Sequence, residues 1–561
     1  MRYWNALAFC QYHLTTTQFV PVSLDVFSTA LSCTRRNAQL LIKRLVKEEV
    51  IEWQPGIGRG NHPKAKRLKC LAQRIEFQAH RCLEQGQIED AIALIHSEKR
   101  NQFLSEYLAQ YQATPSKAHI LQVPFYRGTH NLDPITINRR TEQHIASYLY
   151  ARLLKQDSHS NGFEGDLAHS WVHRGDTLSI VLRKNLTFHD GNPLLAADVK
   201  AHFERLMASS SSSVALFSYI DSVIVDGDYR ITFRSNTMPS LLPKLLAHGA
   251  MGICKMVGDT LYGSGSFILK TQTEWQTTLT CNPHYHGFRP WLDGIEIWNI
   301  GDKAKTFELN SDVVHGSHLK HSRKGFIRHQ QWERGCVHSM LNPKRHTWMR
   351  SLKHRQYLQQ IITSMPEPRG LDCEKLATAT GMMSAPKPIV SQMACIERFD
   401  IAPPCEALTV LTYQLGTHIA SAKRLVETLQ LVGVPCELEV VEYPIFNQLT
   451  TLASADIIVT GEVFSDDIEM SWLGWLLATR SNDACYTSDD RIWLNENIQR
   501  VMQFESDADK HNAFQSLERA LIDKGIYQPM YHVEQDLNVS ENVSTPELLA
   551  NGWIDFNQVT L

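Results

Sequence analysis

The sequence predicts a multidomain chain in which a small helical module with a β-hairpin precedes a much larger α/β region. Three observations lead to this expectation. The chain has 561 residues, of which 43% are hydrophobic; this is about three times the length of a typical domain and enough to form more than one core. The first 69 residues differ from the rest in charge and contain two short amphipathic helical patterns. From about residue 116 the pattern changes to strands separated by helices.

Charge is distributed unevenly along the chain. The whole chain has 56 basic and 59 acidic side chains and a net charge of -3, which taken alone argues against nucleic acid as a partner. Residues 1–69, however, hold eleven Lys and Arg against four acids, a local charge of +7 that leaves -10 for the remainder. Such asymmetry suggests a nucleic-acid-binding module at the N-terminal end.

This basic module contains the pattern of a helix-turn-helix. Ser23 is placed to cap a first helix, and Thr34 to cap a second helix that runs to about Glu49. Apolar residues recur three and four apart and form the buried sides, with Leu24, Phe27 and Leu31 on the first helix and Ala38, Leu41, Ile42 and Leu45 on the second. The opposite side of the second helix carries a polar and basic ridge made of Arg36, Gln39, Lys43 and Lys47. In a helix-turn-helix, the second helix enters the major groove of DNA.

A glycine-rich hairpin follows the second helix. Residues 50–54 resemble a strand, residues 55–60 a hairpin tip, and the basic run to Lys69 the return strand. This is the wing of a winged helix-turn-helix, with Arg59 at its tip directed toward backbone phosphate or the minor groove. A solvated basic face on an ordinary helix pair is the alternative, but the order of the elements favours DNA binding. The residues expected to contact DNA are Thr34, Arg35, Arg36, Asn37, Gln39, Lys43, Lys47, Arg59 and Lys64.

Three domains are expected in total. Residues 1–69 form the winged helix-turn-helix, residues 70–115 form a helical connector, and residues 116–561 form the α/β region. The boundary lies at Thr114-Pro115-Ser116, where the helical pattern breaks. The α/β assignment depends on alternating strands and helices. The strands are expected at 120–125, 176–183, 229–233, 408–413, 436–441 and 457–459, and the helices at 142–154, 196–207 and 417–433.

Several motifs in the α/β region together resemble the family 5 extracellular solute-binding proteins, which serve oligopeptide, dipeptide and nickel transporters. They are Gly165-Asp166-Leu167-Ala168-His169-Ser170-Trp171, Leu186-Thr187-Phe188-His189-Asp190-Gly191-Asn192-Pro193-Leu194, Ala197-Asp198-Val199, Gly263-Ser264-Gly265-Ser266-Phe267 and Leu292-Asp293-Gly294-Ile295. Ser264 and Ser266 depart from the Thr and Pro of the family loop. The resemblance implies a two-lobed α/β domain of the periplasmic-binding-protein type (type II), spanning residues 118–561.

A winged helix-turn-helix fused to such a domain resembles the SgrR family of bacterial transcriptional regulators, implicated in sugar-phosphate stress. The residues that carry the likeness at the turn and wing are Ser32-Cys33-Thr34-Arg35-Arg36 and Gly58-Arg59-Gly60. The resemblance implies a cytoplasmic regulator that binds promoter DNA and senses a small effector, either a sugar phosphate or a peptide-like molecule. RNA polymerase is left open as a further partner. The alternative is a peptide or nickel solute-binding protein associated with an ABC transporter.

Two stretches of the α/β region align with cleft residues of the solute-binding family. The resemblance assigns ligand contacts to Asn131, Asp133, Asp466, Asp467, Trp472 and Trp475. Each acid or aromatic in the second stretch has a plainer alternative. Trp472 and Trp475, three residues apart, are spaced like core aromatics, and Asp466 and Asp467 stand where a helix would be capped.

Other classes of protein are not expected. Met1 to Leu14 lack the apolar core of a secretory signal, and no run of about 18 apolar residues occurs, so neither export nor a membrane partner is predicted. The twelve cysteines are scattered singly, which fits a reduced compartment. The 25 histidines form chance pairs such as His284 and His286, and no metal site, cofactor or catalytic residue is predicted. Enzyme activity is therefore not expected.

Overall fold

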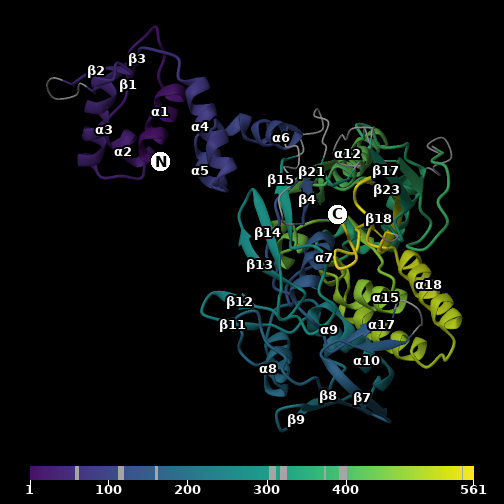
Figure 1. Cartoon of the computed structure of the whole chain (residues 1–561). Coiled ribbons are helices and arrows are strands. Elements are labelled where there is room, and N and C mark those ends of the chain that lie inside the picture. Colours follow the sequence, from purple (N-terminus) through teal and green to yellow (C-terminus); the bar gives the residue numbers. More distant parts are fainter. Residues whose placement is uncertain are drawn as a thin grey trace.

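The computed structural model describes residues 1–56, 62–110, 119–157, 162–301, 311–315, 325–371, 375–390, 401–545 and 548–561. These residues form an N-terminal module, a run of connecting helices and a large two-lobed α/β body (Figure 1). The N-terminal module lies to one side of the body, and α6 is the connecting helix nearest to the body (Figure 1).

The N-terminal module combines three helices with a small antiparallel sheet of order β1-β3-β2. Its elements are α1 (Arg2–His13), β1 (Val20–Pro21), α2 (Leu24–Ala30), α3 (Arg35–Lys47), β2 (Ile51–Gln54) and β3 (Lys64–Arg67). The Ser23 hydroxyl accepts a hydrogen bond from the Val26 amide at 3.1 Å, and Thr34 accepts one from the Asn37 amide at 3.4 Å. Both expected helix caps are therefore confirmed, as is the helix, turn, helix, hairpin order of a winged helix-turn-helix.

The sequence analysis did not anticipate α1, although this helix supplies much of the module's core. Ala6, Leu7 and Cys10 are completely buried and belong to the same cluster as Phe27 of α2 and Leu45 of α3. The helix was missed because Asn5, Gln11 and His13 interrupt the apolar pattern of a short segment. Leu24 and Leu41, expected to be buried, are only half-buried.

The connecting segment is helical, as predicted, with α4 (Ala72–Glu84), α5 (Ile88–Ala93), a 3-10 turn (Ser97–Lys99) and α6 (Arg100–Gln110). Its apolar side chains share one continuous core with the N-terminal module. Ile75, Ala79, Leu104 and Leu108 belong to the same buried cluster as Leu7. The expected break at residues 114–116 lies outside the described residues.

The first lobe contains two four-stranded sheets, of order β13-β14-β15-β4 and β7-β8-β10-β9, and the two-stranded pairs β5-β6 and β11-β12. Its strands are β4 (Ile120–Phe125), β5 (Leu154–Gln156), β6 (Phe163–Gly165), β7 (Ala168–Arg174), β8 (Thr177–Leu182), β9 (Ser222–Asp226), β10 (Arg230–Arg234), β11 (Lys255–Val257), β12 (Thr260–Tyr262), β13 (Phe267–Gln272), β14 (Gln276–Cys281) and β15 (Gly294–Asn299). Its helices are α7 (Arg140–Leu149), α8 (Ala196–Met207), α9 (Val214–Phe217) and α10 (Leu242–Ala247).

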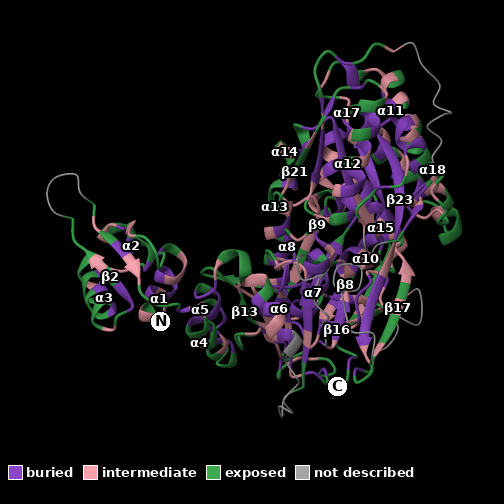
Figure 2. Ribbon diagram, turned by 90° about the horizontal axis from the view of Figure 1, so that it is seen from above, coloured by how far each residue is buried: buried purple, intermediate pink, exposed green. Residues whose placement is uncertain are grey.

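The second lobe is built on a large sheet of order β16-β23-β18-β22-β20-β21, to which β17 and β19 add along β23. Its strands are β16 (Val313–His315), β17 (Phe326–Trp332), β18 (Gly335–Leu341), β19 (Lys375–Thr378), β20 (Leu408–Tyr413), β21 (Cys436–Val441), β22 (Ile457–Val463) and β23 (Tyr527–Ser540). Its helices are α11 (Leu352–Ser364), α12 (Gly416–Leu431), α13 (Tyr443–Phe446), α14 (Leu449–Ala453), α15 (Ile468–Ala478), α16 (Arg480–Cys485), α17 (Ser488–Val501) and α18 (Asp507–Asp523). Buried residues concentrate along the long central strands (Figure 2).

Most of the expected strands and helices are confirmed, several of them residue for residue. β4, α8, β20 and β21 have the predicted bounds. The helix expected at 142–154 is different, because α7 ends at Leu149 and Leu154 already lies in β5. Tyr150 adopts an extended conformation that ends the helix.

Candidate functional site

The exposed face of α3 is the first candidate site. Ala38, Ile42 and Leu45 are buried, and the opposite face presents the expected polar and basic ridge. Its four members are fully exposed and form no side-chain hydrogen bond or ion pair with another described residue: Arg36, Gln39, Lys43 and Lys47. Leu40 lies on the same face with 58% of its surface exposed. The sequence analysis did not single out Leu40, although an apolar side chain in the middle of such a ridge can contact a thymine methyl group.

The other basic residues near this face are engaged within the module. Arg35 forms a two-pronged ion pair with Asp25 of α2. Arg44 pairs with Glu48 at 2.8 Å and lies 4.0 Å above the ring of Tyr3, whose hydroxyl also binds Glu48. The hydrogen bonds from Tyr3 and Arg44 lower the pKa of Glu48. These contacts link α3 to α1 and α2. The side chain of Arg35 stays exposed in its ion pair, so its expected contact with DNA remains a prediction.

An open hollow of about 530 Å³ lies at the N-terminal end of α3. Its lining includes Thr34 and Asn37, both expected at DNA, together with Arg2 of α1. The first amides of a helix attract anions such as DNA phosphate, and Arg2 adds a positive charge beside them. Lys64, on the return strand of the hairpin, is exposed. Arg59 lies outside the described residues.

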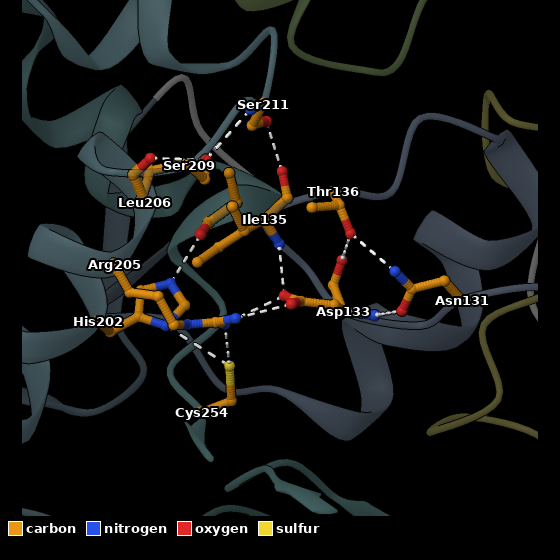
Figure 3. A network of polar contacts seen from close by, with 11 residues as sticks. Asn131, Asp133, Ile135, Thr136, His202, Arg205, Leu206, Ser209, Ser211 and Cys254 are labelled. Carbon is orange, nitrogen blue, oxygen red and sulfur yellow. Dashed lines mark hydrogen bonds and ion pairs between the residues drawn. The ribbon is translucent and has the colours of Figure 1, made fainter. Parts of the chain in front are cut away.

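Asn131 and Asp133 lie in a dense polar network inside the first lobe (Figure 3). The Arg205 guanidinium donates to both carboxylate oxygens of Asp133, at 2.6 and 3.0 Å, and lies 3.1 Å from the Cys254 sulfur. The side chain of Asn131 donates to Thr136 at 2.9 Å and accepts from the Asp133 amide at 2.8 Å. Both residues therefore stabilise the loop before α7, and the carboxylate of Asp133 is already neutralised.

The acids before α15 tie the two lobes together. Asp467 caps α15 by accepting from the Met470 amide at 3.0 Å, and it pairs with Lys244 of α10 at 3.3 Å. Lys244 also reaches Glu469 at 3.4 Å. Asp466 is exposed and pairs with Arg334 at 3.2 Å. The capping role that was the alternative for these acids is thus observed for Asp467, and its ion pair joins α10 of the first lobe to α15 of the second.

Trp472 and Trp475 pack in the hydrophobic core rather than line an exposed surface. Their exposed fractions are 0% and 1%. Trp472 stacks on Phe514 with ring centroids 5.8 Å apart, and Trp475 contacts Tyr527 at 4.9 Å. The expectation that both rings contact a ligand is replaced by core packing, because both tryptophans lie on the buried part of α15 together with Met470, Leu473 and Leu476.

A polar group between the lobes was not anticipated. We define the interlobe cluster as Arg127, Arg139, Arg140 and Glu142 of the first lobe with Tyr413, Tyr443 and Glu462 of the second. Arg127 donates to both oxygens of Glu142, at 2.8 and 3.3 Å. Arg139 lies 4.4 Å from the ring centre of Tyr443, whose hydroxyl donates to the Asn138 carbonyl at 3.2 Å. The adjacent pair Arg139-Arg140 was the one signal in the sequence.

Electrostatics within the interlobe cluster are unusual. Burial raises the pKa of the Glu462 carboxyl to about 7, against the opposing effect of Arg140. Burial also favours the neutral form of Glu142, but the guanidinium of Arg127 outweighs it and lowers the pKa of Glu142. Arg140 pairs with Glu333 at 2.7 Å. The cluster therefore contains three arginines, of which two have a carboxylate partner at hydrogen-bond distance.

The connecting helices contact the segment that passes between the sheets of the body. The rings of Tyr107 in α6 and Trp298 in β15 are 6.3 Å apart. Trp298, Ile300 and Val314 belong to the same buried cluster as the N-terminal module. Since β15 lies in a first-lobe sheet and β16, which holds Val314, lies in the second-lobe sheet, the connecting helix α6 contacts the junction of the two lobes.

Comparison with known proteins adds to this geometry. Residues 9–114 match the family described as "Sugar transport-related sRNA regulator N-term", and residues 162–314 match "Bacterial extracellular solute-binding proteins, family 5 Middle". The chain joins an SgrR-type domain to a family 5 solute-binding domain. The first match covers the winged module and the connecting helices together, the same stretch that shares a core.

Several curated relatives are named HTH-type transcriptional regulator SgrR. The HTH-type transcriptional regulator SgrR of Salmonella choleraesuis is 27% identical over 292 residues, which is 50% of this chain and 51% of the relative. The chain thus spans about half the length of that protein in the alignment. The SgrR of Yersinia enterocolitica is 23% identical over 95% of this chain and 94% of its own length. The alignment with the Yersinia protein therefore extends over both matched regions of this chain.

Solved structures show the fold of the body. The nickel-binding protein NikA of Staphylococcus aureus, in complex with Ni(L-His)2, superposes with a TM-score of 0.60 at 15% identity and covers 79% of this chain and 99% of its own. A dipeptide-binding protein from Pseudoalteromonas, in complex with Met-Leu, gives 0.63 at 14% identity over 78% of this chain and 99% of its own. The two-lobed α/β fold of the family 5 binding proteins is thus confirmed.

Within the residues that the structure describes, no helix is long and apolar enough to cross a membrane. The same part of the chain contains no group of three or more His, Cys, Asp or Glu placed to hold a metal ion.

Proposed function

We propose that the protein is a cytoplasmic transcriptional regulator whose SgrR-type domain binds promoter DNA and whose family 5 domain senses a small effector. The observation that carries the proposal is the free basic face of α3 in a module whose core extends to the junction between the lobes. Neither feature has a use in a protein that only delivers solute to a transporter. The SgrR name of the relatives supports the same reading.

The proposed division of labour follows the expected domains. Residues 1–69 bind DNA through Arg36, Gln39, Lys43 and Lys47, with Thr34 and Asn37 at a phosphate and the hairpin reaching the neighbouring groove. Residues 116–561 bind the effector, and residues 70–115 transmit the resulting conformational change to the DNA-binding module. RNA polymerase remains a partner to be tested once a promoter is known.

Ligand control operates through lobe arrangement. A ligand that binds one arrangement of the two lobes more tightly shifts the population toward it. Helix α6 packs on the segment between the lobes. Each lobe arrangement therefore presents a different contact surface to α6 and holds the DNA-binding module in a different position. A coupling of about 1 to 3 kcal/mol changes DNA affinity roughly 5- to 150-fold.

The test is DNA affinity with and without effector. A duplex is selected from random sequence with the full-length protein, and binding is followed by fluorescence anisotropy across a panel of sugar phosphates and short peptides. We expect a panel member to change the Kd by at least about fivefold, and replacement of Lys43 and Lys47 by Gln to weaken binding and flatten its salt dependence. The proposal would be contradicted if the selection enriched no DNA sequence. It would also be contradicted if a ligand bound tightly and left the affinity for DNA unchanged.

A further inference from the structure

We propose that Arg139 anchors an oxyanion, a phosphate or carboxylate group of the small effector, between the two lobes. This inference rests on the proposed function, because it names the ligand chemistry of the same sensing domain. It concerns Arg139, a residue to which the resemblance had not assigned the ligand.

The guanidinium of Arg139 is buried without a matching acceptor. Only 9% of the side chain is exposed, and its Nη1 has no hydrogen-bond partner within the described part of the chain. The nearest carboxylate oxygen, on Glu142, is 4.0 Å away. A buried cation without hydrogen-bonded partners is costly, and an oxyanion would supply the acceptors that this group lacks.

The carboxylate of Glu142 is hydrogen-bonded to Arg127 and not to Arg139. Its carboxylate accepts two hydrogen bonds from Arg127 and a third from the His130 amide at 3.1 Å. The pKa of Arg139 is lowered, first by burial and then by the positive charge of Arg127. Since Arg140 is paired with Glu333, Arg139 is the arginine of the interlobe cluster that has no carboxylate at hydrogen-bond distance. A cation or a metal ion would be repelled there.

Both lobes enclose this position. Arg139 immediately precedes α7 of the first lobe, whereas Tyr443, stacked on its guanidinium at 4.4 Å, belongs to α13 of the second. Tyr413 of β20 packs edge-on against Tyr443, with ring centroids 5.0 Å apart. An anion bound at Arg139 therefore contacts the boundary between the lobes and reports on their closure.

The experiment uses the full-length protein and pairs of ligands that differ in one charge. Thermal shift and titration calorimetry are run with inorganic phosphate, a hexose phosphate and the free hexose, and a dipeptide and its C-terminal amide. We expect an anionic member of at least one pair to bind at least tenfold more tightly than its uncharged counterpart. The pair that responds tells a phosphate from a carboxylate.

Variants assign that effect to Arg139. Arg139→Gln should lower the affinity for the anionic ligand about tenfold or more. Arg139→Lys should retain part of the affinity, because it keeps the positive charge but loses the bidentate hydrogen bonding of the guanidinium. Arg289→Gln is the matched control, since Arg289 is exposed and pairs with Asp293 at 2.9 Å. Free Arg139→Gln protein should melt no lower than the wild type, because an unpaired buried charge has been removed.

Three results would overturn the subsite: no anion in the panel binds, charged and uncharged partners bind alike, or Arg139→Gln binds the anion as the wild type does. The proposed function fails separately. An anion that binds through Arg139 and leaves DNA affinity unchanged would refute the coupling and keep the subsite. An uncharged effector that alters DNA affinity equally in the wild type and in Arg139→Gln would refute the subsite and keep the coupling.

Discussion

Replacement of Arg36 by Ala, compared with the same change at Arg35, tests how α3 contacts DNA. The two arginines are neighbours in sequence and were both expected at the groove. In the structure only Arg36 is free, because the guanidinium of Arg35 is held by the carboxylate of Asp25. Arg36 lies on the same helix face as Leu40, Lys43 and Lys47.

The magnitude follows from this difference. A good bidentate contact between arginine and guanine contributes about 1 to 3 kcal/mol, so Arg36→Ala should raise the Kd for the selected duplex roughly 5- to 150-fold. Arg35→Ala should have the smaller effect, because Arg35 would have to leave Asp25 before it could bind a base. If Arg36 contacts phosphate alone, the loss would be similar for all sequences and the salt slope would fall by about one.

The assay is fluorescence anisotropy on the selected duplex and on a scrambled duplex, each at several salt concentrations, with circular dichroism to confirm that the variants fold. The reasoning would be refuted if Arg35→Ala weakened specific binding more than Arg36→Ala did. It would also be refuted if neither variant changed the affinity for the selected duplex.

Four further predictions concern the body and its link to the module. Glu142→Gln should destabilise the protein by about 3 to 5 kcal/mol in urea unfolding, because Arg127 would be buried without a carboxylate; a change below about 1 kcal/mol would contradict this. Trp472→Ala should cost about 3 to 5 kcal/mol in the same measurement, as expected for a fully buried ring, and a ligand-contact role alone would leave stability unchanged. Tyr107→Ala should preserve DNA binding and effector binding but reduce the effect of one on the other, because it removes the contact with Trp298; undiminished coupling would refute that route. Burial raises the pKa of Glu462 to about 7, so its contribution to stability is present below pH 4.5 and is lost between pH 4.5 and 7, by up to about 1.4 kcal/mol per pH unit. Glu462→Gln should flatten that dependence, and an unaltered pH profile of urea unfolding would count against it.

The helix-turn-helix could be predicted from sequence because its signals are local. Ser23 and Thr34 cap helices through atoms only three residues away, and the buried stripe of α3 repeats at helical spacing. The strand and helix bounds of β4, α8, β20 and β21 were predictable for the same reason. Helix α1 was not, because its apolar residues become meaningful only when α2 and α3 pack against them.

The candidate effector residues could not be predicted in this way, since their partners are distant in sequence. Asp133 is neutralised by Arg205, 72 residues later, and Asp467 pairs with Lys244, 223 residues earlier. Tyr443 reaches Asn138 across 305 positions. A residue type at one position shows nothing of such pairing, so a free acid and a structural acid look alike until the fold brings their partners together.

The contacts between the lobes also limit how the effector can act at a distance. Polar contacts between the lobes include the stacking of Tyr443 on Arg139, the ion pair of Lys244 with Asp467, and the pairing of Arg140 with Glu333. The partly exposed ion pairs contribute about 0 to 1 kcal/mol each, whereas the apolar contacts between the lobes, such as those of α9 with α15, belong to one continuous buried cluster. An oxyanion on Arg139 would add a charge-assisted contact of about 1.5 to 3 kcal/mol at that boundary. This lies within the 1 to 3 kcal/mol that an allosteric effect on DNA affinity requires, so one anion would drive the response through α6 if the two lobe arrangements of the free protein differ by no more than that.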